Sequence, residues 1–436
     1  MFRKLVVNKP TDEHESLQVK NRNKPFHYII LFLVISNITL IVINAGIWIM
    51  ADFQKLFVAA DFTSFYTGYY MVRVGEGENL YDAAIQSKYQ QEFMAGRTFE
   101  GGVLLFPNPP YVAILLSPIS LLPLNLAFYL WSLIQMSLLI WMLFSFNRLF
   151  SHWDKLERVI LLIAILAFWP LTNTFMLGQF SLLLLIGLLQ MYIAMKNSTL
   201  TRAGFWLSLL TIKPHTLLIP GMMTLNRRYW RVAVIILVIG ISLLIGSWLI
   251  IGSQPWIQYI QSLKALSSYF GEYGVHPNTE YTIRGVLSNL LGGSQADFIN
   301  IISILVLLVG MIYVWFLWRK GISQNSPRFM LYFAFTVLLS VFLSLHLNPH
   351  DSLLLVLPAA LFYDYLRGLN LPRRVYSILL LVSPPVFLIA AFNNYNLFGI
   401  FRPPVIVILI LLAWMIYYLI RDHRKDQEKS IITIPT

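Results

Sequence analysis

Asp61 is the first residue of this sequence whose type and position suit catalysis. It follows the first long apolar segment and opens a stretch in which Phe62, Phe65, Tyr66 and Tyr69 recur at helical spacing. This pattern predicts an amphipathic helix along the membrane interface. A carboxylate at that boundary is partly desolvated, which raises its proton affinity toward the range of a general base. A simpler interpretation is that Asp61 only caps the helix.

Lys213 is the second candidate, because it lies in the middle of the apolar segment 203–224, next to Pro214 and His215. An ammonium group at this depth is costly and usually faces a cavity or a partner. Proline loosens the helix around it. In a cavity, an anionic ligand such as a lipid phosphate would compensate the charge. Alternatively, the side chain reaches the membrane surface.

A short polar link between two apolar segments carries His346, Asn348, His350 and Asp351. Histidine and aspartate ligate metals, but three such residues do not define a site. A tight turn capped by Asp351 explains the link equally well. The functional alternative that we favour is phosphate or sugar binding by His350, and we predict neither a metal nor another cofactor.

Several other polar residues interrupt the apolar sequence. Asn108 stands in a proline-rich segment and either belongs to a turn or hydrogen-bonds a polar ligand. Gly178 suits a tight turn between helices, but Gln179 needs hydrogen-bond partners at that depth. Arg284 either anchors a helix end or clamps a phosphate. The remaining candidates for substrate binding are Tyr66, Tyr81, His215 and Asp351.

The elements that must position these residues are membrane helices. The chain has 436 residues, of which 57% are hydrophobic and 12% charged. Its apolar runs are long enough to cross ~30 Å of hydrocarbon as helices, and they lack the alternation of barrel strands. We therefore predict an all-α bundle with about 10–12 membrane spans, with interfacial helices in the first outer loop. The candidate spans are 27–49, 104–122, 127–147, 159–177, 180–196, 203–224, 232–252, 297–318, 329–345, 352–366, 376–393 and 403–420.

The charges suggest how these spans are oriented. Basic loops alternate with basic-poor loops, which places both termini in the cytoplasm. The expected organisation is a cytoplasmic arm (1–26), one transmembrane domain (27–420) with outer loops at about 51–103 and 253–296, and a cytoplasmic tail (421–436). The net charge of +12 follows from these loops and ends, so it does not indicate a nucleic-acid partner.

Simple counting of spans leaves one conflict, because it places the basic residues near 155 and 196–202 outside. A re-entrant segment at 104–122 and a break in 203–224 at Lys213-Pro214 would remove it. Both basic loops would then return to the cytoplasm, and Gln179 would reach the outer face.

In its motifs, the chain resembles glycosyltransferase family 87, the polyprenyl-phosphate-mannose-dependent mannosyltransferases of the GT-C superfamily. The run Glu280-Tyr281-Thr282 departs from the family pattern, which has an Asn-Gln-Ser type of run there. The matching features, in family order, are the segment from Asp61 to Asp82, the prolines at 107–110, Gly178-Gln179, Lys213-Pro214-His215 and His350-Asp351.

This resemblance implies inverting sugar transfer, with mannose as the expected sugar, from a polyprenyl phosphate to a lipid or glycan acceptor on the outer face of the cell membrane. Asp61 would be the general base, and Lys213, His350 and Arg284 would stabilise the phosphate. Two alternatives stay open. One is a related enzyme that uses another lipid-linked sugar or a protein acceptor. The other is a transporter or flippase of lipid-linked saccharides, against which the long Asp-bearing outer loop argues.

Overall fold

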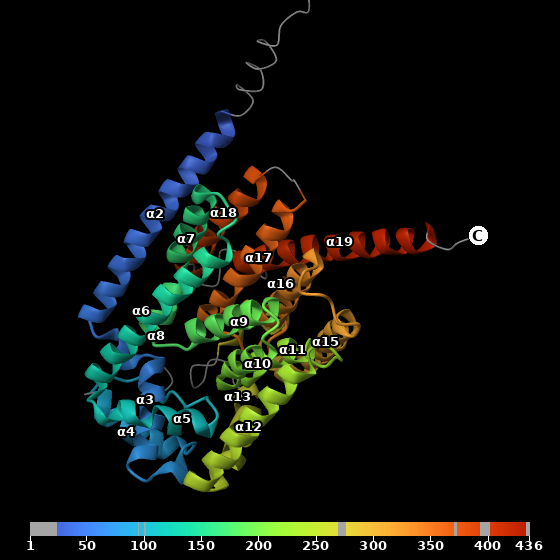
Figure 1. Ribbon diagram of the computed structural model, residues 1–436. Coiled ribbons are helices and arrows are strands. Elements are labelled where there is room, and N and C mark those ends of the chain that lie inside the picture. The colour runs from blue at the N-terminus through green and yellow to red at the C-terminus, as the bar shows by residue number, and fades with distance from the viewer. Residues whose placement is uncertain are drawn as a thin grey trace, which may run out of the picture.

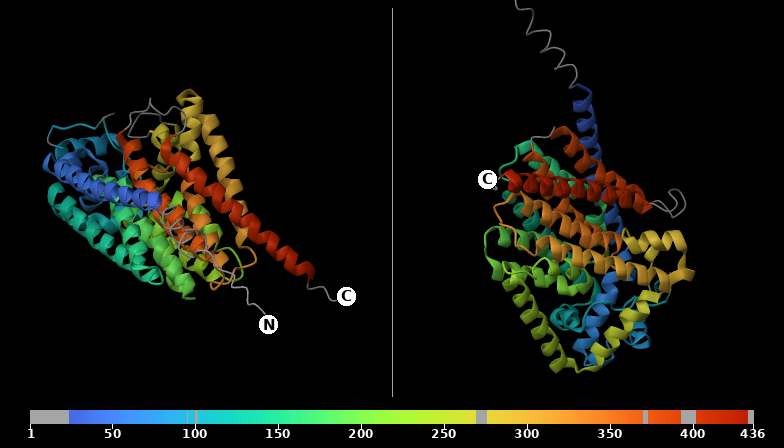
Figure 2. Two further views of the ribbon diagram at one scale, coloured as in Figure 1. Left: turned by 90° about the horizontal axis from the view of Figure 1, so that it is seen from above. Right: turned by 90° about the vertical axis from the view of Figure 1, so that its right-hand side faces the viewer.

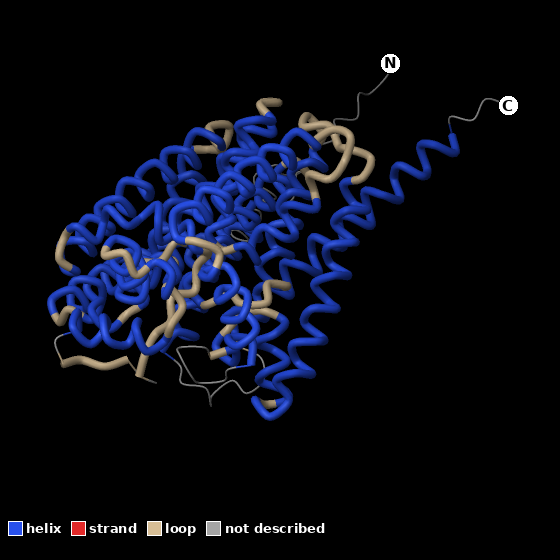
Figure 3. The backbone as a smooth tube through the Cα atoms, turned by 90° about the horizontal axis from the view of Figure 1, so that it is seen from below, coloured by secondary structure: helices blue, strands red, loops and turns tan. Residues whose placement is uncertain are grey.

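A computed structural model describes residues 24–94, 96–99, 102–268, 276–369, 373–392 and 402–432. Within these ranges the chain consists of helices and loops, without β-strands (Figure 3). The predicted all-α class is therefore confirmed. Residues 1–23 of the predicted N-terminal arm lie outside the described residues, and the predicted C-terminal tail begins as a continuation of the last helix.

The helices differ widely in length, and short 3₁₀ turns connect several of them. The α-helices are α2 (Lys24–Phe53), α3 (Asp61–Arg73), α4 (Ala83–Met94), α5 (Pro110–Leu116), α6 (Leu124–Leu149), α7 (Lys155–Ala167), α8 (Trp169–Leu177), α9 (Ser181–Lys196), α10 (Leu200–Ser208), α11 (Pro214–Met222), α12 (Trp230–Ile251), α13 (Gln254–Ser268), α14 (Ile283–Leu291), α15 (Ala296–Trp318), α16 (Pro327–Phe342), α17 (Val356–Arg367), α18 (Arg373–Phe392) and α19 (Pro403–Ile432). The 3₁₀ helices are η1 (Leu56–Ala59), η2 (Gly77–Asn79), η3 (Ser117–Leu121), η4 (Leu209–Ile212), η5 (Pro277–Thr279), η6 (Gly293–Gln295) and η7 (Pro349–Leu355).

Long apolar helices make this a multi-pass membrane protein. Helices α7 and α8 meet at a bend of 44°. Counted together as one bent span, they are long and apolar enough to cross a membrane. Pro170 lies in the first turn of α8, where its missing N–H suits a helix start that does not continue α7. Five segments are each long and apolar enough to cross a membrane: Tyr28–Phe53, Leu124–Leu149, Trp230–Ile251, Gly293–Trp318 and Pro403–His423.

The other predicted spans form shorter or broken helices. For example, α9 has 16 residues and, at ~1.5 Å per residue, is about 24 Å long, less than the ~30 Å of hydrocarbon. Nearly all of its side chains are buried by the protein, so its apolar composition reflects a place in the core. Length and composition thus support five or six full spans among the described residues, fewer than the sequence suggested.

The chain breaks at Lys213-Pro214, as predicted. Helix α10 tightens into η4, and Lys213 then adopts an extended backbone (φ −125°, ψ 83°) before α11 begins at Pro214. The segment 104–122 is also interrupted, since α5 passes into η3 at Ser117-Pro118. Both interruptions coincide with prolines, which cannot donate a backbone hydrogen bond.

Basic loops far apart in sequence lie at one end of the molecule. His152 Nε2 lies 2.7 Å from Asp364 Oδ1, and Arg228 donates a hydrogen bond to Gln324. Lys196 lines a cavity of about 740 Å³ together with His152, Gln324 and Asp364. The loops near 155 and 196–202 therefore share an end with the other basic loops, as the re-entrant arrangement requires. That this end is cytoplasmic remains a prediction.

Helix α3 in the first predicted outer loop is present, but its aromatic residues do not form a lipid-facing stripe. Phe62, Phe65, Tyr66 and Tyr69 are all buried. They pack within the protein, for instance against Phe106 in the loop before α5 and Phe128 of α6. Because α5 and η3 pack over this helix, protein covers the faces that the sequence pattern assigned to membrane and water.

The centre of the bundle is formed by α9 and α16, both buried over most of their lengths. Figure 1 shows them between α2 on one side and α15 on the other. Helix α16 packs on α15, α17 and α19, which lie side by side in both views of Figure 2. This core holds in place the polar link at 346–351, which follows α16, and η7, which begins within that link.

Candidate active site

A cavity of about 260 Å³ lies between the first predicted outer loop, the break at Lys213 and the polar link at 346–351. Its walls come from segments that are distant in sequence, so only the folded chain assembles it. Six of the predicted site residues line it: Asn108, Gln179, Lys213, His215, Arg284 and Asp351. The residues that sequence reasoning did not select are Phe65, Pro107, Ile212, Pro214, Tyr259, Leu263, Asn300, Ile304, Leu345, His346 and Asn348.

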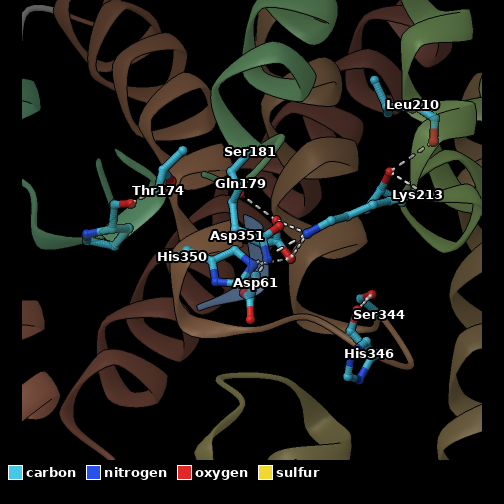
Figure 4. Close-up of polar contacts among 12 residues, drawn as sticks. Asp61, Thr174, Gln179, Ser181, Leu210, Lys213, Ser344, His346, His350 and Asp351 are labelled. Atoms are coloured by element: carbon cyan, nitrogen blue, oxygen red, sulfur yellow. Dashed lines mark hydrogen bonds and ion pairs between the residues drawn. The ribbon is translucent and has the colours of Figure 1, made fainter. Parts of the chain in front are cut away.

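Asp61 stands beside this cavity at the first residue of α3. Among the described residues, the recorded hydrogen-bond donor to its carboxylate is the side-chain amide of Gln179 (Figure 4). Desolvation by the surrounding protein raises the pKa of Asp61, although the Gln179 hydrogen bond and the Lys213 charge oppose this shift. The carboxylate is therefore directed to the cavity wall, and capping of α3 is not its main contact.

The turn that carries Gln179 is fixed by its neighbours. Gly178 has a φ of +66°, a conformation that favours glycine, and a Cβ there would lie 2.8 Å from Phe62. Trp131 Nε1 donates to the Gly178 carbonyl at 2.8 Å. Gln135 Nε2 donates to the Gln179 carbonyl at 2.8 Å. The predicted tight turn is thus present. It places the Gln179 side-chain amide beside Asp61, where the amide donates a hydrogen bond.

Lys213 is paired within the protein. Its Nζ lies 2.8 Å from both carboxylate oxygens of Asp351, and Ser181 Oγ donates to Asp351 Oδ1 at 2.6 Å. Burial alone would raise the pKa of Asp351, but the Lys213 and His350 neighbours outweigh it and hold the pKa well below its usual value. Since Asp351 already compensates the ammonium charge, a ligand phosphate is not needed for that purpose, and Asp351 is more than a turn cap.

His350 lies behind this ion pair. Its Nε2 is 3.4 Å from Lys213 Nζ and 3.5 Å from Asp351 Oδ2. Burial lowers the pKa of His350 to about 3, so the ring is neutral at physiological pH. Its side chain is not part of the cavity lining, unlike that of His346.

Arg284 also has an acidic partner at the cavity. Its Nη1 lies 3.2 Å from Glu280 Oε1, and its Nε donates to Asn300 Oδ1 at 3.2 Å. Arg284 lines the cavity, and its ion pair with Glu280 lies at the start of α14. Both interpretations offered by the sequence, helix anchor and ligand contact, are therefore compatible with its position.

Three polar atoms in the cavity lining have no hydrogen-bond partner among the described residues. They are Asn108 Nδ2, Gln179 Oε1 and His215 Nε2, and each is buried. Buried polar groups are nearly always paired in folded proteins, so an unpaired set needs an explanation. A ligand rich in hydrogen-bond donors and acceptors would satisfy all three.

Two predicted substrate-binding residues are not in the cavity lining. Tyr66 OH donates to the Leu122 carbonyl at 2.9 Å, so its hydroxyl serves a contact with the residue that follows η3. Tyr81 OH donates to the Asn108 carbonyl, and so supports a residue that does line the cavity. Their direct contact with substrate therefore gains no support from the geometry.

Comparison with known proteins identifies the family. The sequence pattern of glycosyltransferase family 87 matches residues 106–347, more than half of the chain. The chain belongs to glycosyltransferase family 87. A polyprenol-phosphate-mannose-dependent alpha-(1-2)-phosphatidylinositol pentamannoside mannosyltransferase of Mycolicibacterium smegmatis is 27% identical over 191 residues. That alignment covers 43% of this chain and 45% of the relative, less than half of either protein. No solved structure matches.

The family 87 match includes only part of the cavity. It contains Asn108, Gln179, Lys213 and Arg284 but neither Asp61 nor the His350-Asp351 pair. Two residues outside the match contact residues inside it, since Asp61 accepts a hydrogen bond from Gln179 and Asp351 pairs with Lys213. The tertiary structure therefore connects the candidate base to the family region.

The metal interpretation of the polar link gains no support. His346 Nδ1 lies 3.1 Å from Glu280 Oε1, whereas His350 and Asp351 face Lys213 (Figure 4). No group of three His, Cys, Asp or Glu side chains suited to a metal ion occurs in the parts of the chain that the structure describes. Glu280 and His346 were not among the predicted site residues. A single acidic residue beside an apolar segment was a signal by which Glu280 could have been found.

Proposed function

We propose that this protein is an inverting glycosyltransferase that moves mannose from a polyprenyl phosphate to a lipid or glycan acceptor. The observation that carries the proposal is the position of Asp61 beside a cavity whose lining residues include three buried, unpaired polar atoms. Family membership and the mannosyltransferase relative supply the reaction class and the donor. The name of that relative includes phosphatidylinositol pentamannoside, a glycolipid, which supports an acceptor of that class here.

In the proposed reaction, the acceptor hydroxyl oxygen attacks the anomeric carbon on the face opposite the phosphate. The new carbon–oxygen bond forms as the bond to the phosphate oxygen breaks, and that oxygen keeps the electron pair. Asp61 takes the proton of the acceptor hydroxyl. Its raised pKa suits this role, because a base with higher proton affinity removes the proton more readily once it is ionised.

Lys213 and Arg284 provide the positive side of the cavity. Each is held by an acid, Asp351 and Glu280 respectively, so the charges are fixed before substrate binds. Fixed charges and dipoles stabilise growing phosphate charge without a cost of reorganisation. We assign His350 to support of the Lys213–Asp351 pair, in place of the direct phosphate contact that the sequence suggested.

We place this cavity on the outer face of the membrane. The basic loops gather at one end of the molecule, and basic loops favour the cytoplasmic side. The cavity is built instead from the predicted outer loops and the polar link. A polyprenyl-phosphate sugar at the outer leaflet would then meet Asp61 from the membrane side.

The test is transfer of radiolabelled mannose from polyprenyl-phosphate mannose in membranes that contain the protein. We expect labelled acceptor with wild type and none with Asp61→Asn. Glu92→Gln is the matched control, since Glu92 is an exposed acid on α4 of the same loop, and it should leave transfer unchanged. Equal transfer by wild type and Asp61→Asn would remove Asp61 from the mechanism. Label that crosses the membrane yet stays on the polyprenyl phosphate would instead indicate a flippase.

A further inference from the structure

Glu280 is a buried acid that joins three other side chains at the cavity. Its Oε1 lies 3.2 Å from Arg284 Nη1 and 3.1 Å from His346 Nδ1. Its Oε2 accepts a hydrogen bond from Thr282 Oγ1 at 3.1 Å. The side chain of Glu280 is fully inaccessible to solvent, so these contacts hold it in one orientation. It is also the residue at which the sequence departs from the expected family run.

The backbone around Glu280 is equally constrained. Thr282 caps α14 by accepting from the Gly285 N–H at 3.1 Å. Gly285 allows the Glu280 carbonyl to approach closely, since a Cβ at this glycine would lie 2.2 Å from that oxygen. The fold therefore fixes the carboxylate relative to α14 before any ligand binds.

This carboxylate requires a proton on Nδ1 of His346. A carboxylate paired with Arg284 offers only acceptor atoms, so the His346 Nδ1 beside it must be the donor. The other ring nitrogen, Nε2, takes part in none of the hydrogen bonds recorded among the described residues. The side chain is 41% exposed and lines the same cavity as Lys213 and Arg284. Figure 4 shows it on the loop beneath the Lys213–Asp351 pair.

We propose that His346, oriented by Glu280, is a further catalytic residue that donates a hydrogen bond from Nε2 to the phosphate of the donor. This inference rests on the proposed function. The proposed donor is the ring with protons on both nitrogens, in which Glu280 accepts the hydrogen bond from Nδ1 while it also pairs with Arg284. As the anomeric carbon–oxygen bond breaks, its electron pair goes to the phosphate oxygen, and the Nε2–H stabilises the added charge. The proton stays on His346, while Asp61 takes the proton of the acceptor hydroxyl.

Lys213, His350 and His215 are less suited to this role. Lys213 Nζ already contacts both oxygens of Asp351 at 2.8 Å. His350 is enclosed behind that pair. His215 also lines the cavity, with its ring centre 6.3 Å from that of His346, but no carboxylate contact is recorded for it. Of the two histidines that line the cavity, His346 is thus the one with a carboxylate partner.

Two variants of His346 separate hydrogen bonding at its two nitrogens. The amide of His346→Asn can keep the contact with Glu280 but leaves nothing at the Nε2 position. The longer His346→Gln can place an amide donor near that position. We expect kcat/KM for polyprenyl-phosphate mannose to fall on the order of 100-fold in His346→Asn, the effect of losing one preorganised donor. We expect His346→Gln to stay within about 10-fold of wild type, because it keeps the donor.

His276→Asn is the control, because His276 belongs to the same outer region but not to the cavity lining, and it should transfer as wild type does. Monodispersity and thermal unfolding in detergent establish that each variant is folded. Wild-type transfer by His346→Asn, or equal losses in folded Asn and Gln variants, would overturn the role of His346. Asp61→Asn is measured in parallel. A silent wild type would refute the proposed function itself, whereas an active wild type, a silent Asp61→Asn and an active His346→Asn would refute only this inference.

Discussion

Lys213 Nζ lies 2.8 Å from both carboxylate oxygens of Asp351, although the two residues are 138 positions apart. The pair joins the break between η4 and α11 to the start of η7. Neither side chain is more than 11% exposed, so each charge depends on the other for compensation. The ion pair therefore serves two purposes. It connects two segments that are remote in the chain, and it places a fixed cation at the cavity.

Removal of one partner of this pair should destabilise the protein. In Lys213→Met or Asp351→Asn, the remaining charge is buried without compensation, which typically costs ~3–5 kcal/mol. The double variant should recover most of this loss, because no bare charge remains. The measurement is the apparent melting temperature in detergent for both single variants and the double variant. Strictly additive losses would show that the two charges are not coupled.

The pH dependence of transfer should report Asp61. A general base works only when ionised, so activity should fall as the pH decreases through the raised pKa of Asp61. Gln179→Met removes a hydrogen bond that lowers this pKa. The acid limb of kcat/KM should therefore move to higher pH in that variant. An acid limb that stays in place would mean that another group limits the rate.

Gly178 and Gly240 form a matched pair of substitution sites. Gly178→Ala should be destabilising, since alanine is strained at a φ of +66° and its Cβ would lie 2.8 Å from Phe62. It should also slow transfer, because it displaces the turn that carries Gln179. Gly240→Ala meets no atom within 4 Å and should be neutral or stabilising by about 0.4–1 kcal/mol. The comparison requires melting temperatures of both variants and transfer rates, and similar effects at both sites would contradict it.

The orientation in the membrane can be tested with single cysteines, because the sequence has none of its own. Ser151→Cys, Asn197→Cys and Asn325→Cys lie at exposed positions of the basic end. An impermeant maleimide should label them only after the cells are opened. Lys88→Cys and Ser294→Cys, exposed in the predicted outer loops, should react in intact cells. Labelling of Ser151→Cys or Asn197→Cys from outside would rule out a shared cytoplasmic face.

The sequence by itself determined the class of protein and the local breaks in its helices. Composition alone requires lipid as the solvent, and backbone groups in lipid must pair within their own helix. Proline cannot continue that pairing, so the break at Lys213-Pro214 was readable from two residues. The turn at Gly178 was also predictable, because it depends on the conformation of a single residue.

Only the tertiary structure decided which polar residues meet. Asp61 accepts a hydrogen bond from Gln179, and Lys213 forms an ion pair with Asp351. Arg284 and His346 both contact Glu280. The number of full spans was also decided there, because burial by protein and exposure to lipid select the same apolar side chains. A charge in the core is stabilised by whichever partner the fold brings within about 4 Å, and that distance is set by packing between helices that are remote in the chain.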